Sequence, residues 1–300
     1  MAKIAAELTR ALAQRALQGG AGSPTTRLLA QGPGWTVEDV ICTSGPGDRA
    51  YEEQHSRISI AIVAAGTFQY RSAKRRELMT PGSLMLGSPG QCFECGHEHG
   101  RGDRCLNFSY TPEYWETLAE GVTFKTLRLP PLRALSPIVA KASAALTRPV
   151  AWEELSVELA AQTLQLAAVA RNTVPNPAAE ARVTRIVRNI EHDPSATLAL
   201  ATLASEAGLS PYHFLRTFEQ LTGVTPHQFI LRARLRDGAQ RLSESGRILD
   251  IALETGFGDL SNFNRTFRAE FGVTPKAWRN STKNGAPRMT LPVSTLGRDL

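Results

Sequence analysis

The chain has 300 residues, which is enough for two domains that each bury a hydrophobic core. Hydrophobic residues make up 42% of it and charged residues 21%, which is typical of a globular protein and excludes a disordered chain. No apolar run approaches the roughly 18 residues that a membrane-spanning helix needs.

The segment 2–19 predicts a helix, because Ile4, Leu8 and Leu12 share one face and two glycines follow. It contains Glu7 and lacks a continuous apolar run or a clear cleavage site, so we do not interpret it as a secretory signal. We therefore expect a cytoplasmic protein. Its four cysteines would be reduced there unless they bind metal or sense oxidants.

Short runs of β-branched and alternating residues follow, separated by Gly and Pro turns. Several strands at this spacing suggest a small two-sheet barrel or jelly roll. Cys42 is expected only to fill a strand, and the basic stretch 71–76 to form an exposed hairpin turn without an assigned function. The expected strands are 35–44, 58–64, 67–71, 83–86, 105–110 and 122–129.

A cluster of cysteines and histidines lies within fourteen residues and exceeds the four ligands of a tetrahedral zinc or copper site. Its first two cysteines have chelate spacing, and its histidines at i and i+2 would lie on one side of an extended segment. We predict one transition-metal ion here, with zinc favoured; a reversible thiol sensor and a structural role are the alternatives. The predicted ligands are Cys92, Cys95, His97, His99 and Cys105.

The region 131–177 predicts helices and then a proline-containing linker from Asn172 to Pro177. Apolar residues recur at intervals of three and four, as in a coiled-coil seam: Trp152, Leu155, Leu159, Gln162, Leu166 and Val169. This seam predicts a homodimer through residues 152–170. Packing of the same residues against the chain's own β-barrel is the alternative.

The C-terminal part contains the same pattern twice, at an offset of 49 residues. The first copy runs from Phe214 to Phe229, and the second from Phe263 to Trp278. Each copy reads as a helix, a tight turn and a second helix, so the simplest explanation is a duplicated helix-turn-helix unit. Gly208 is expected to end the first helix, and Ser210 followed by Pro211 to begin the second.

Each second helix has an apolar stripe that must pack inward and an opposite face that stays free. Helices presented in this way enter the DNA major groove, where arginine pairs with guanine and asparagine with adenine. The alternative is an ordinary solvated face. The free faces carry Tyr212, Leu215, Arg216 and Glu219 in the first copy, and Ser261, Asn264, Arg265 and Arg268 in the second.

A long helix from Pro226 to about Ser243 is expected to fix the distance between the two units. Residues 178–283 carry 14 Lys and Arg against 11 Asp and Glu, so DNA affinity must come from placed arginines rather than from net charge. Residues 281–300 show no pattern and are expected to be a disordered tail. Arginines expected to project outward are Arg232, Arg234, Arg236 and Arg241, and those expected near phosphate are Arg182, Arg185 and Arg188.

Residues 182–279 resemble the DNA-binding domain of the AraC/XylS family of bacterial transcription regulators. The motifs that carry the resemblance are Leu-Ser-Pro-Tyr-His-Phe-Leu-Arg-Thr-Phe, Ser-Asn-Phe-Asn-Arg-Thr-Phe and the two Gly-Val-Thr-Pro turns. Thr80-Pro81-Gly82-Ser83 loosely resembles the cupin-like sensing domain of such regulators, although the paired histidines of a cupin metal site are missing. The resemblance implies DNA contacts by Tyr212, Leu215, Arg216, Leu260, Ser261, Asn264 and Arg265. Arg268, on the same free face, is also predicted to contact DNA.

We therefore predict an α+β fold with a cupin-like sensing domain at 1–130, a helical dimerisation region and linker at 131–177, a double helix-turn-helix domain at 178–281 and a tail at 282–300. The predicted function is sequence-specific transcription regulation in response to a small-molecule, metal or redox signal, without enzyme activity. Double-stranded DNA, an unknown effector and, for an activator, RNA polymerase are the expected partners. A metal-dependent cupin-like enzyme fused to a DNA-binding domain is the alternative, and an architectural DNA-bending protein is a third hypothesis.

Overall fold

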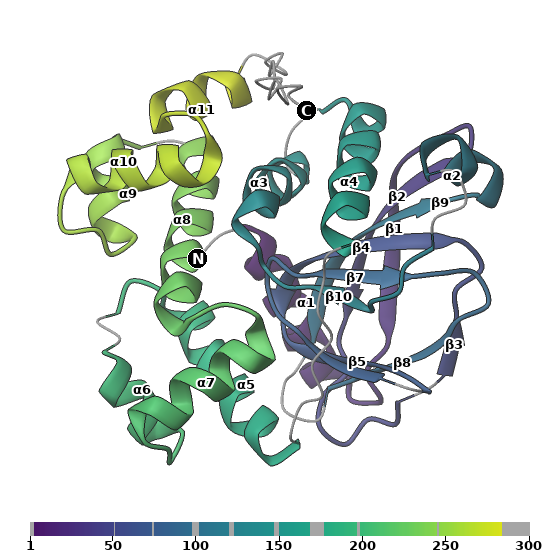
Figure 1. Cartoon of the computed structure of the whole chain (residues 1–300), viewed down its shortest axis with the longest axis horizontal. Coiled ribbons are helices and arrows are strands. Elements are labelled where there is room, and N and C mark those ends of the chain that lie inside the picture. The colour runs from purple at the N-terminus through teal and green to yellow at the C-terminus, as the bar shows by residue number, and fades with distance from the viewer. Residues whose placement is uncertain are drawn as a thin grey trace, which may run out of the picture.

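The computed structural model describes residues 3–50, 52–73, 75–97, 102–119, 123–146, 150–168, 177–196, 199–244 and 246–283. A β-domain formed by the N-terminal part of the chain lies beside a group of C-terminal helices (Figure 1). The predicted α+β class, a two-sheet barrel followed by an all-helical domain, is confirmed. Among the described helices, none combines the length and apolar character needed to cross a bilayer.

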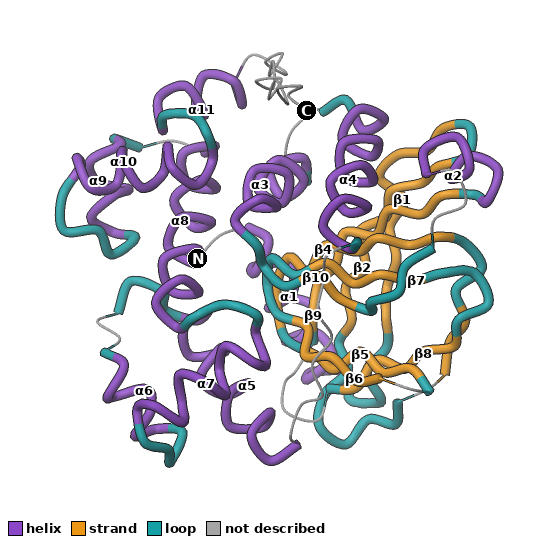
Figure 2. The backbone as a smooth tube through the Cα atoms, viewed as in Figure 1, coloured by secondary structure: helices purple, strands orange, loops and turns teal. Residues whose placement is uncertain are grey.

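The β-domain consists of two antiparallel sheets that pack against each other (Figure 2). One sheet has six strands in the order β1-β2-β9-β4-β7-β10, and the other has four in the order β3-β8-β5-β6. The strands are β1 (Pro24–Gly32), β2 (Trp35–Cys42), β3 (Glu52–Gln54), β4 (Ile58–Gly66), β5 (Phe68–Ser72), β6 (Arg75–Met79), β7 (Leu84–Gly87), β8 (Cys92–Gly96), β9 (Asp103–Tyr110) and β10 (Arg128–Leu129).

The six-stranded sheet buries apolar side chains on both faces. Its inner face meets Phe68, Tyr70 and Phe93 of the smaller sheet, and its outer face is covered by helices. The covering helices are α2 (Pro112–Ala119), α3 (Ser136–Ala145) and α4 (Trp152–Ala167), with α1 (Lys3–Gln18) against β2, β4 and β9. Continuous apolar runs such as Ile60–Val63 are the expected consequence of burial on both faces.

Most of the predicted strands are confirmed. Of the predicted strand 122–129, residue 122 lies outside the described residues, and the rest is wrong except for the two residues of β10. The sequence did not predict β1, because its first five residues are exposed and show no alternation of apolar and polar side chains. It hid β8 as well, because Cys92–Gly96 was interpreted only as a set of metal ligands. The predicted basic hairpin turn lies between β5 and β6, although Arg75 and Arg76 belong to β6 itself.

The predicted dimer seam on α4 faces the chain's own β-domain. Leu155 and Leu159 are buried in the core that covers the outer face of the six-stranded sheet, and Trp152, Leu164 and Leu166 pack against it. The alternative interpretation of the seam is therefore the one the contacts support. A homodimer through 152–170 stays a prediction and would have to use the exposed side of α4; Val169 and Ala170 lie outside the described residues.

The C-terminal domain contains two helix-turn-helix units joined by one long helix (Figure 1). Phe214 and Phe218 are buried in the core of the first unit, and Phe263 and Phe267 in that of the second. The helices are α5 (Pro177–His192), α6 (Leu200–Glu206), α7 (Pro211–Thr222), α8 (Pro226–Glu244), α9 (Ile248–Glu254), α10 (Leu260–Phe271) and α11 (Pro275–Lys283). Of the predicted tail, residues 284–300 lie outside the described residues, as does most of the predicted linker.

Arg234 on α8 ties both units together through three backbone carbonyls. Its guanidinium donates to the carbonyl oxygens of Pro194 (2.7 Å) and Ala196 (2.9 Å), which precede α6, and to that of Gly256 (2.8 Å), in the turn after α9. The planar guanidinium carries five N–H donors, so one arginine side chain can reach all three carbonyls at once. This contact fixes the orientation of each turn relative to α8.

Replacing Arg234 with methionine should destabilise the C-terminal domain by about 1.5–3 kcal/mol, because hydrogen bonds to a charged donor are lost and partly buried carbonyls remain. Urea unfolding followed by circular dichroism measures this change. The matched control is Lys276→Met, which removes an exposed cation of the same domain and should leave the free energy of unfolding unchanged. Equal stability of the two variants would show that the three contacts are not formed in solution.

Candidate nucleic-acid interface

The second helix of the first unit, α7, presents a polar face to solvent. Ser210 caps its N-terminus by accepting from the backbone N–H of His213 (3.4 Å), and Gly223, with φ of 79°, ends it. Tyr212 is 62% exposed and Arg216 is exposed one turn later, with Nη1 of the arginine donating to the tyrosine hydroxyl at 3.2 Å. The guanidinium also lies over the tyrosine ring, 5.9 Å from its centroid. The pair is therefore held together on the face opposite the core.

The second unit repeats this arrangement on α10. Asp259 caps the helix by accepting from the backbone N–H of Asn262 at 2.7 Å, and Gly272 ends it in the left-handed conformation. Arg265 donates to the side-chain oxygen of Asn262 at 3.2 Å, which directs its guanidinium along the helix surface. The exposed polar residues of this helix are Ser261, Asn264, Arg265 and Arg268.

The structure thus places the predicted DNA-facing residues on two surface helices at matching positions. Leu215 is only partly exposed, and Leu260 packs against the core of the second unit, so these two offer less apolar surface than Tyr212. Both exposed faces could be predicted from the duplicated sequence, because the buried phenylalanines of each unit determine which side of the helix faces solvent.

The arginines of α8 were predicted to project outward, and this is wrong. Arg232 is bound by Glu270, Arg236 by Glu191, and Arg241 by Asp237 and Glu254, while Arg234 forms the contact between the two turns. Each is partly buried because α8 lies between the two units and the β-domain. The exposed Arg185 donates to the carbonyl oxygen of Glu206, so its predicted phosphate contact stays untested.

Comparison with known proteins agrees with this geometry. A helix-turn-helix domain model matches residues 203–281. The multiple antibiotic resistance protein MarA of Salmonella typhimurium is 32% identical over 106 residues, which are 35% of this chain and 84% of that protein. An uncharacterised HTH-type transcriptional regulator of Bacillus subtilis, YbfI, is 24% identical over 223 residues, 69% of this chain and 79% of that protein.

A solved structure of a transcriptional regulator with an AraC-type DNA-binding domain, from Chromobacterium violaceum, is 27% identical, with a TM-score of 0.34 over 36% of this chain and 98% of that chain. Two helix-turn-helix units with exposed, arginine-bearing second helices define a DNA-binding transcription regulator. The similarity to its sequence relatives shows that the chain belongs to the AraC family of transcription regulators.

A segment that leads out of the β-domain holds the first unit in place. We call residues 128–140 the strap. The buried Arg128 pairs with Glu77 of β6 and donates through Nη1 to the carbonyl oxygens of Leu78 (3.0 Å) and Leu221 (2.8 Å). Leu221 lies in the last turn of α7, where carbonyls lack helical partners and a cation is favourable. Burial lowers the pKa of Arg128, and the charges of Glu77 and Glu180 oppose that effect.

The strap also holds the second unit. Arg133 donates from Nε to the carbonyl oxygen of Ala269 at 3.0 Å, near the end of α10, and Ser136 donates to the carboxylate of Glu270. The same carboxylate accepts from Arg232 at 3.1 Å, and Arg232 donates to the carbonyl oxygen of Pro131 at 2.6 Å. One strap therefore contacts the C-terminal ends of both exposed helices.

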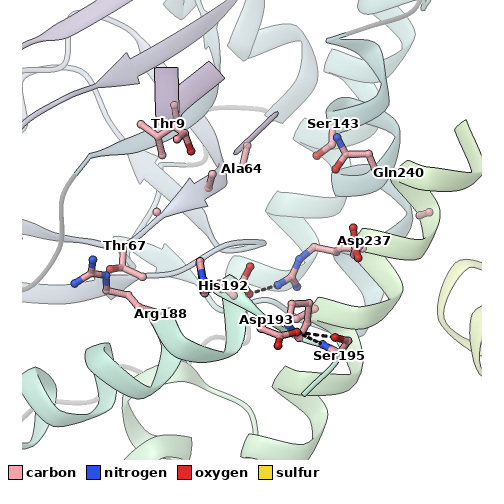
Figure 3. Close-up of a pocket in the computed structure, with 18 of the residues that line it drawn as sticks. Thr9, Ala64, Thr67, Ser143, Arg188, His192, Asp193, Ser195, Asp237 and Gln240 are labelled. Atoms are coloured by element: carbon pink, nitrogen blue, oxygen red, sulfur yellow. Dashed lines mark hydrogen bonds and ion pairs between the residues drawn. The ribbon is translucent and has the colours of Figure 1, made fainter. Parts of the chain in front are cut away.

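A cleft of about 680 Å³ lies between the β-domain and the DNA-binding domain. Figure 3 shows Thr9 of α1 and Ala64 near the end of β4 on one side, and Asp237 and Gln240 of α8 on the other, with Ser143 of α3 beside Gln240. Arg236 crosses this region to reach Glu191 at 2.5 Å. The cleft places polar groups of the DNA-binding domain opposite α1 and the end of β4.

A second cavity, of about 340 Å³, lies inside the β-domain and brings thiols together. Cys42, Cys95 and Cys105 line it from β2, β8 and β9, together with Asp103. A ring nitrogen of the buried His97, the Sγ of Cys42 and a carboxylate oxygen of Asp103 lie within 4.8 Å of one another. Sequence reasoning missed Cys42 and Asp103, because only the pairing of β2 with β9 places residue 42 opposite residue 103.

The predicted metal ligands are only partly brought together. Cys92 and Cys95 are three residues apart on β8, so their side chains point to opposite sides of the strand. Cys95 lines the cavity, whereas Cys92 does not and accepts a hydrogen bond from Nε2 of Gln54 at 3.8 Å. The chelate spacing of this pair would apply to a turn and not to a strand. His99 lies outside the described residues.

The electrostatics of the thiol cavity disfavour a reactive cysteine among its buried thiols. Burial raises the pKa of Cys95 and of Cys105 well above the usual range, and the charge of Asp103 adds to the rise, so neither forms a thiolate readily in the metal-free protein. Burial lowers the pKa of His97, but its hydrogen bond to Asp103 and the neighbouring Cys42 raise it to about 9.

His55, the one candidate for a cupin-type histidine ligand in the sequence, is occupied by packing. It stacks on Phe93 with ring centroids 4.2 Å apart, and its Nε2 lies 2.7 Å from the hydroxyl of Tyr70, which donates to the carbonyl oxygen of Leu86. Burial lowers the pKa of His55 to about 4. The imidazole is therefore neutral in the folded state at pH values where the unfolded chain is protonated.

This pKa shift predicts loss of stability in mild acid. Between pH 6.5 and about 4 the unfolded chain binds a proton at His55 that the folded chain excludes, so the free energy of unfolding falls as the pH falls, by about 3 kcal/mol from pH 7 to pH 4. His55→Gln should remove that part of the pH dependence, as measured by urea unfolding at both pH values. The control His227→Gln, at an exposed position, should retain it; identical pH profiles of both variants would refute the prediction.

Proposed function

We propose that this regulator reads one DNA site through α7 and α10, which enter successive segments of the major groove. The observation that carries the proposal is the matched exposure of Arg216 and Arg265, 49 residues apart, on helices whose other faces are buried. A guanidinium can bond both acceptors of a guanine edge, and the amide of Asn264 can bond an adenine edge. Tyr212 and Ser261 lie beside them and can contact bases or phosphate.

α8 supports this proposal because it fixes the separation of the two reading helices. It has 19 residues and rises about 1.5 Å per residue, so it spans about 28 Å, comparable to one turn of B-DNA. Arg234 locks the turns of both units to this helix, so the two faces cannot move independently. If only one helix-turn-helix unit bound DNA, the exposed face of the other unit would have no contact with DNA.

We also propose that the β-domain receives the signal that sets DNA affinity. The strap supports this, because Arg128 and Arg133 connect the barrel to the ends of both reading helices. The expected effector classes are a small molecule, a metal ion or an oxidant. Activation through RNA polymerase is a further part of the proposal, to be tested by transcription from a promoter that carries the site.

Arg216→Ala and Arg265→Ala should each weaken binding to the specific site by about 1–3 kcal/mol and relax the preference for one base pair, because a bidentate base contact is lost. Fluorescence anisotropy with the footprinted upstream site of the chain's own gene, and with single-base variants of that site, measures both effects. The control Arg57→Ala removes an exposed cation of the β-domain and should change neither. Unchanged affinity and preference in both variants would show that other faces contact DNA.

The homodimer that we propose has to use the exposed residues of α4, since its apolar seam is buried within the chain. Glu154, Ala161 and Gln165 lie on the exposed side of α4, and the small side chain of Ala161 permits close approach of a second helix. Sedimentation at micromolar concentration should show a dimer for the unaltered chain and a monomer for Ala161→Arg. The control is Arg57→Ala, and a monomeric unaltered chain would remove this part of the proposal.

A further inference from the structure

At one end of the thiol cavity a thiol lies beside an imidazole and a carboxylate. Cys42 ends β2, lines the cavity and is partly exposed. Its Sγ, a ring nitrogen of His97 and a carboxylate oxygen of Asp103 lie within 4.8 Å of one another, and Nε2 of His97 is 2.6 Å from the carboxylate. The Sγ of Cys42 also donates to the hydroxyl of Ser44 at 3.3 Å. A nucleophile, an imidazole and an orienting carboxylate in this order are the groups that activate a cysteine.

We propose that Cys42 is a covalent sensor thiol, which adds to a small α,β-unsaturated carbonyl compound that enters the thiol cavity, and that the adduct is the signal for the regulator. The inference rests on the proposed role of the β-domain as the sensor and names the chemistry of its effector. The other two thiols of the cavity are unsuited to this reaction, because burial and the charge of Asp103 raise the pKa of Cys95 and of Cys105.

His97 is placed to stabilise the thiolate of Cys42 and to supply a proton. Burial lowers the pKa of His97, but the hydrogen bond to Asp103 and the neighbouring Cys42 raise it to about 9, so the ring is an imidazolium at neutral pH. An imidazolium beside a cysteine stabilises its thiolate, which is the nucleophilic form. Asp103 is a positioning residue, because its hydrogen bond fixes the orientation of the ring.

The reaction adds a thiol across a C=C bond and needs no oxidant, metal or leaving group. The Sγ of Cys42 forms a bond to the β-carbon, and the electron pair of the C=C bond moves toward the carbonyl to give an enolate. The imidazolium of His97 then protonates this enolate. The thiol proton of Cys42 replaces the proton that His97 gives, so the adduct contains every atom of both reactants.

The cavity suits a small conjugated compound. Its volume of about 340 Å³ has room for an organic molecule and not only for a peroxide. Phe68 and Phe93 line it with apolar rings, and Arg57 and Ser109 line it with groups that can donate to a carbonyl oxygen. Phe68 also stacks on His97, with ring centroids 5.8 Å apart, so a planar ligand in contact with Phe68 lies close to the proton donor.

Direct packing connects Cys42 to the interdomain cleft. Gly102 lies against the backbone of Cys42: a Cβ there would be 2.8 Å from the carbonyl oxygen of Cys42 and 3.0 Å from Cδ1 of Leu8. With φ of 66° and no space for a side chain, this position requires glycine. Leu8 and Leu12 of α1 line the cleft opposite the DNA-binding domain, so an adduct that shifts the end of β2 also shifts α1.

The test treats the purified, reduced full chain with crotonaldehyde, fixes the adduct with borohydride and locates it by peptide mass spectrometry. We expect one adduct per chain at Cys42, formed at least about 10-fold faster than at Cys92, which is partly exposed but does not line the cavity. Cys42→Ser should abolish this adduct, and the matched control Cys92→Ser should react as the unaltered chain does. Fluorescence anisotropy with the same upstream DNA site should show a changed affinity for the modified chain.

Iodoacetamide separates the two roles of His97, because its reaction with a thiolate releases iodide and needs no proton. His97→Gln should lower the rate with crotonaldehyde by about 100-fold, and the rate with iodoacetamide by less. Asp103→Asn should also lower the rate with crotonaldehyde, and Asp103→Glu should restore part of it, since a carboxylate again orients the ring.

Each result bears on one part of the inference. Modification of another cysteine ahead of Cys42 in the unaltered chain overturns the site, and this mapping needs no variant to fold. Equal losses of rate with both reagents in His97→Gln overturn its role as proton donor, provided that urea unfolding of the variant matches that of the unaltered chain. Equal DNA affinity of the modified and unmodified chains overturns the role of the adduct as signal. Failure of the unaltered chain to bind any DNA, modified or not, overturns the proposed function instead.

Discussion

The arrangement of this regulator depends on the strap and its contacts with the C-terminal ends of two helices. The last carbonyls of an α-helix lack partners within the helix and carry partial negative charge. The strap supplies guanidinium groups there, Arg128 at α7 and Arg133 at α10. The exposed faces of both helices are thus fixed relative to the β-domain by a segment of a few residues. A displacement of the strap changes both contacts at once.

Charged residues that are buried in the domain interface make this docking specific. Arg76 pairs with the fully buried Glu180 of α5, Arg128 with Glu77, and Glu270 with Arg232. Buried ion pairs add little net stability, because desolvation opposes their attraction, but an unmatched partner is costly. An alternative packing of the two domains would separate Arg76 from Glu180 and would remove the interdomain hydrogen bonds of Arg128 to Leu221 and of Ser136 to Glu270. The interface therefore favours discrete arrangements over gradual sliding.

The sequence predicted the parts of the structure that local patterns determine. The duplicated helix-turn-helix units, their caps at Ser210 and their exposed faces follow from helical periodicity within about seventy residues. What it could not predict depends on contacts between distant segments. Three contacts show this: Cys42 pairs with Asp103 across two strands, Leu159 packs against the β-domain, and Arg76 binds Glu180 across the domain interface. Each contact joins elements that are far apart in the sequence. Three of the α8 arginines appeared exposed for the same reason: the partners of Arg232 and Arg236 lie in other helices and the strap, and those of Arg234 lie in the turns of both units.

Because the strap contacts both the β-domain and the DNA-binding domain, an effect of DNA on the β-domain is expected as well as the opposite one. If a ligand of the β-domain changes the affinity for DNA by some factor, linkage requires that DNA change the affinity for that ligand by the same factor. Binding to the promoter would then change the affinity of the β-domain for its ligand. Regulator molecules bound to DNA would respond to a different range of ligand concentration from free molecules. The strap contacts the β-domain and the ends of both α7 and α10, and it is the link through which we propose that this reciprocity acts.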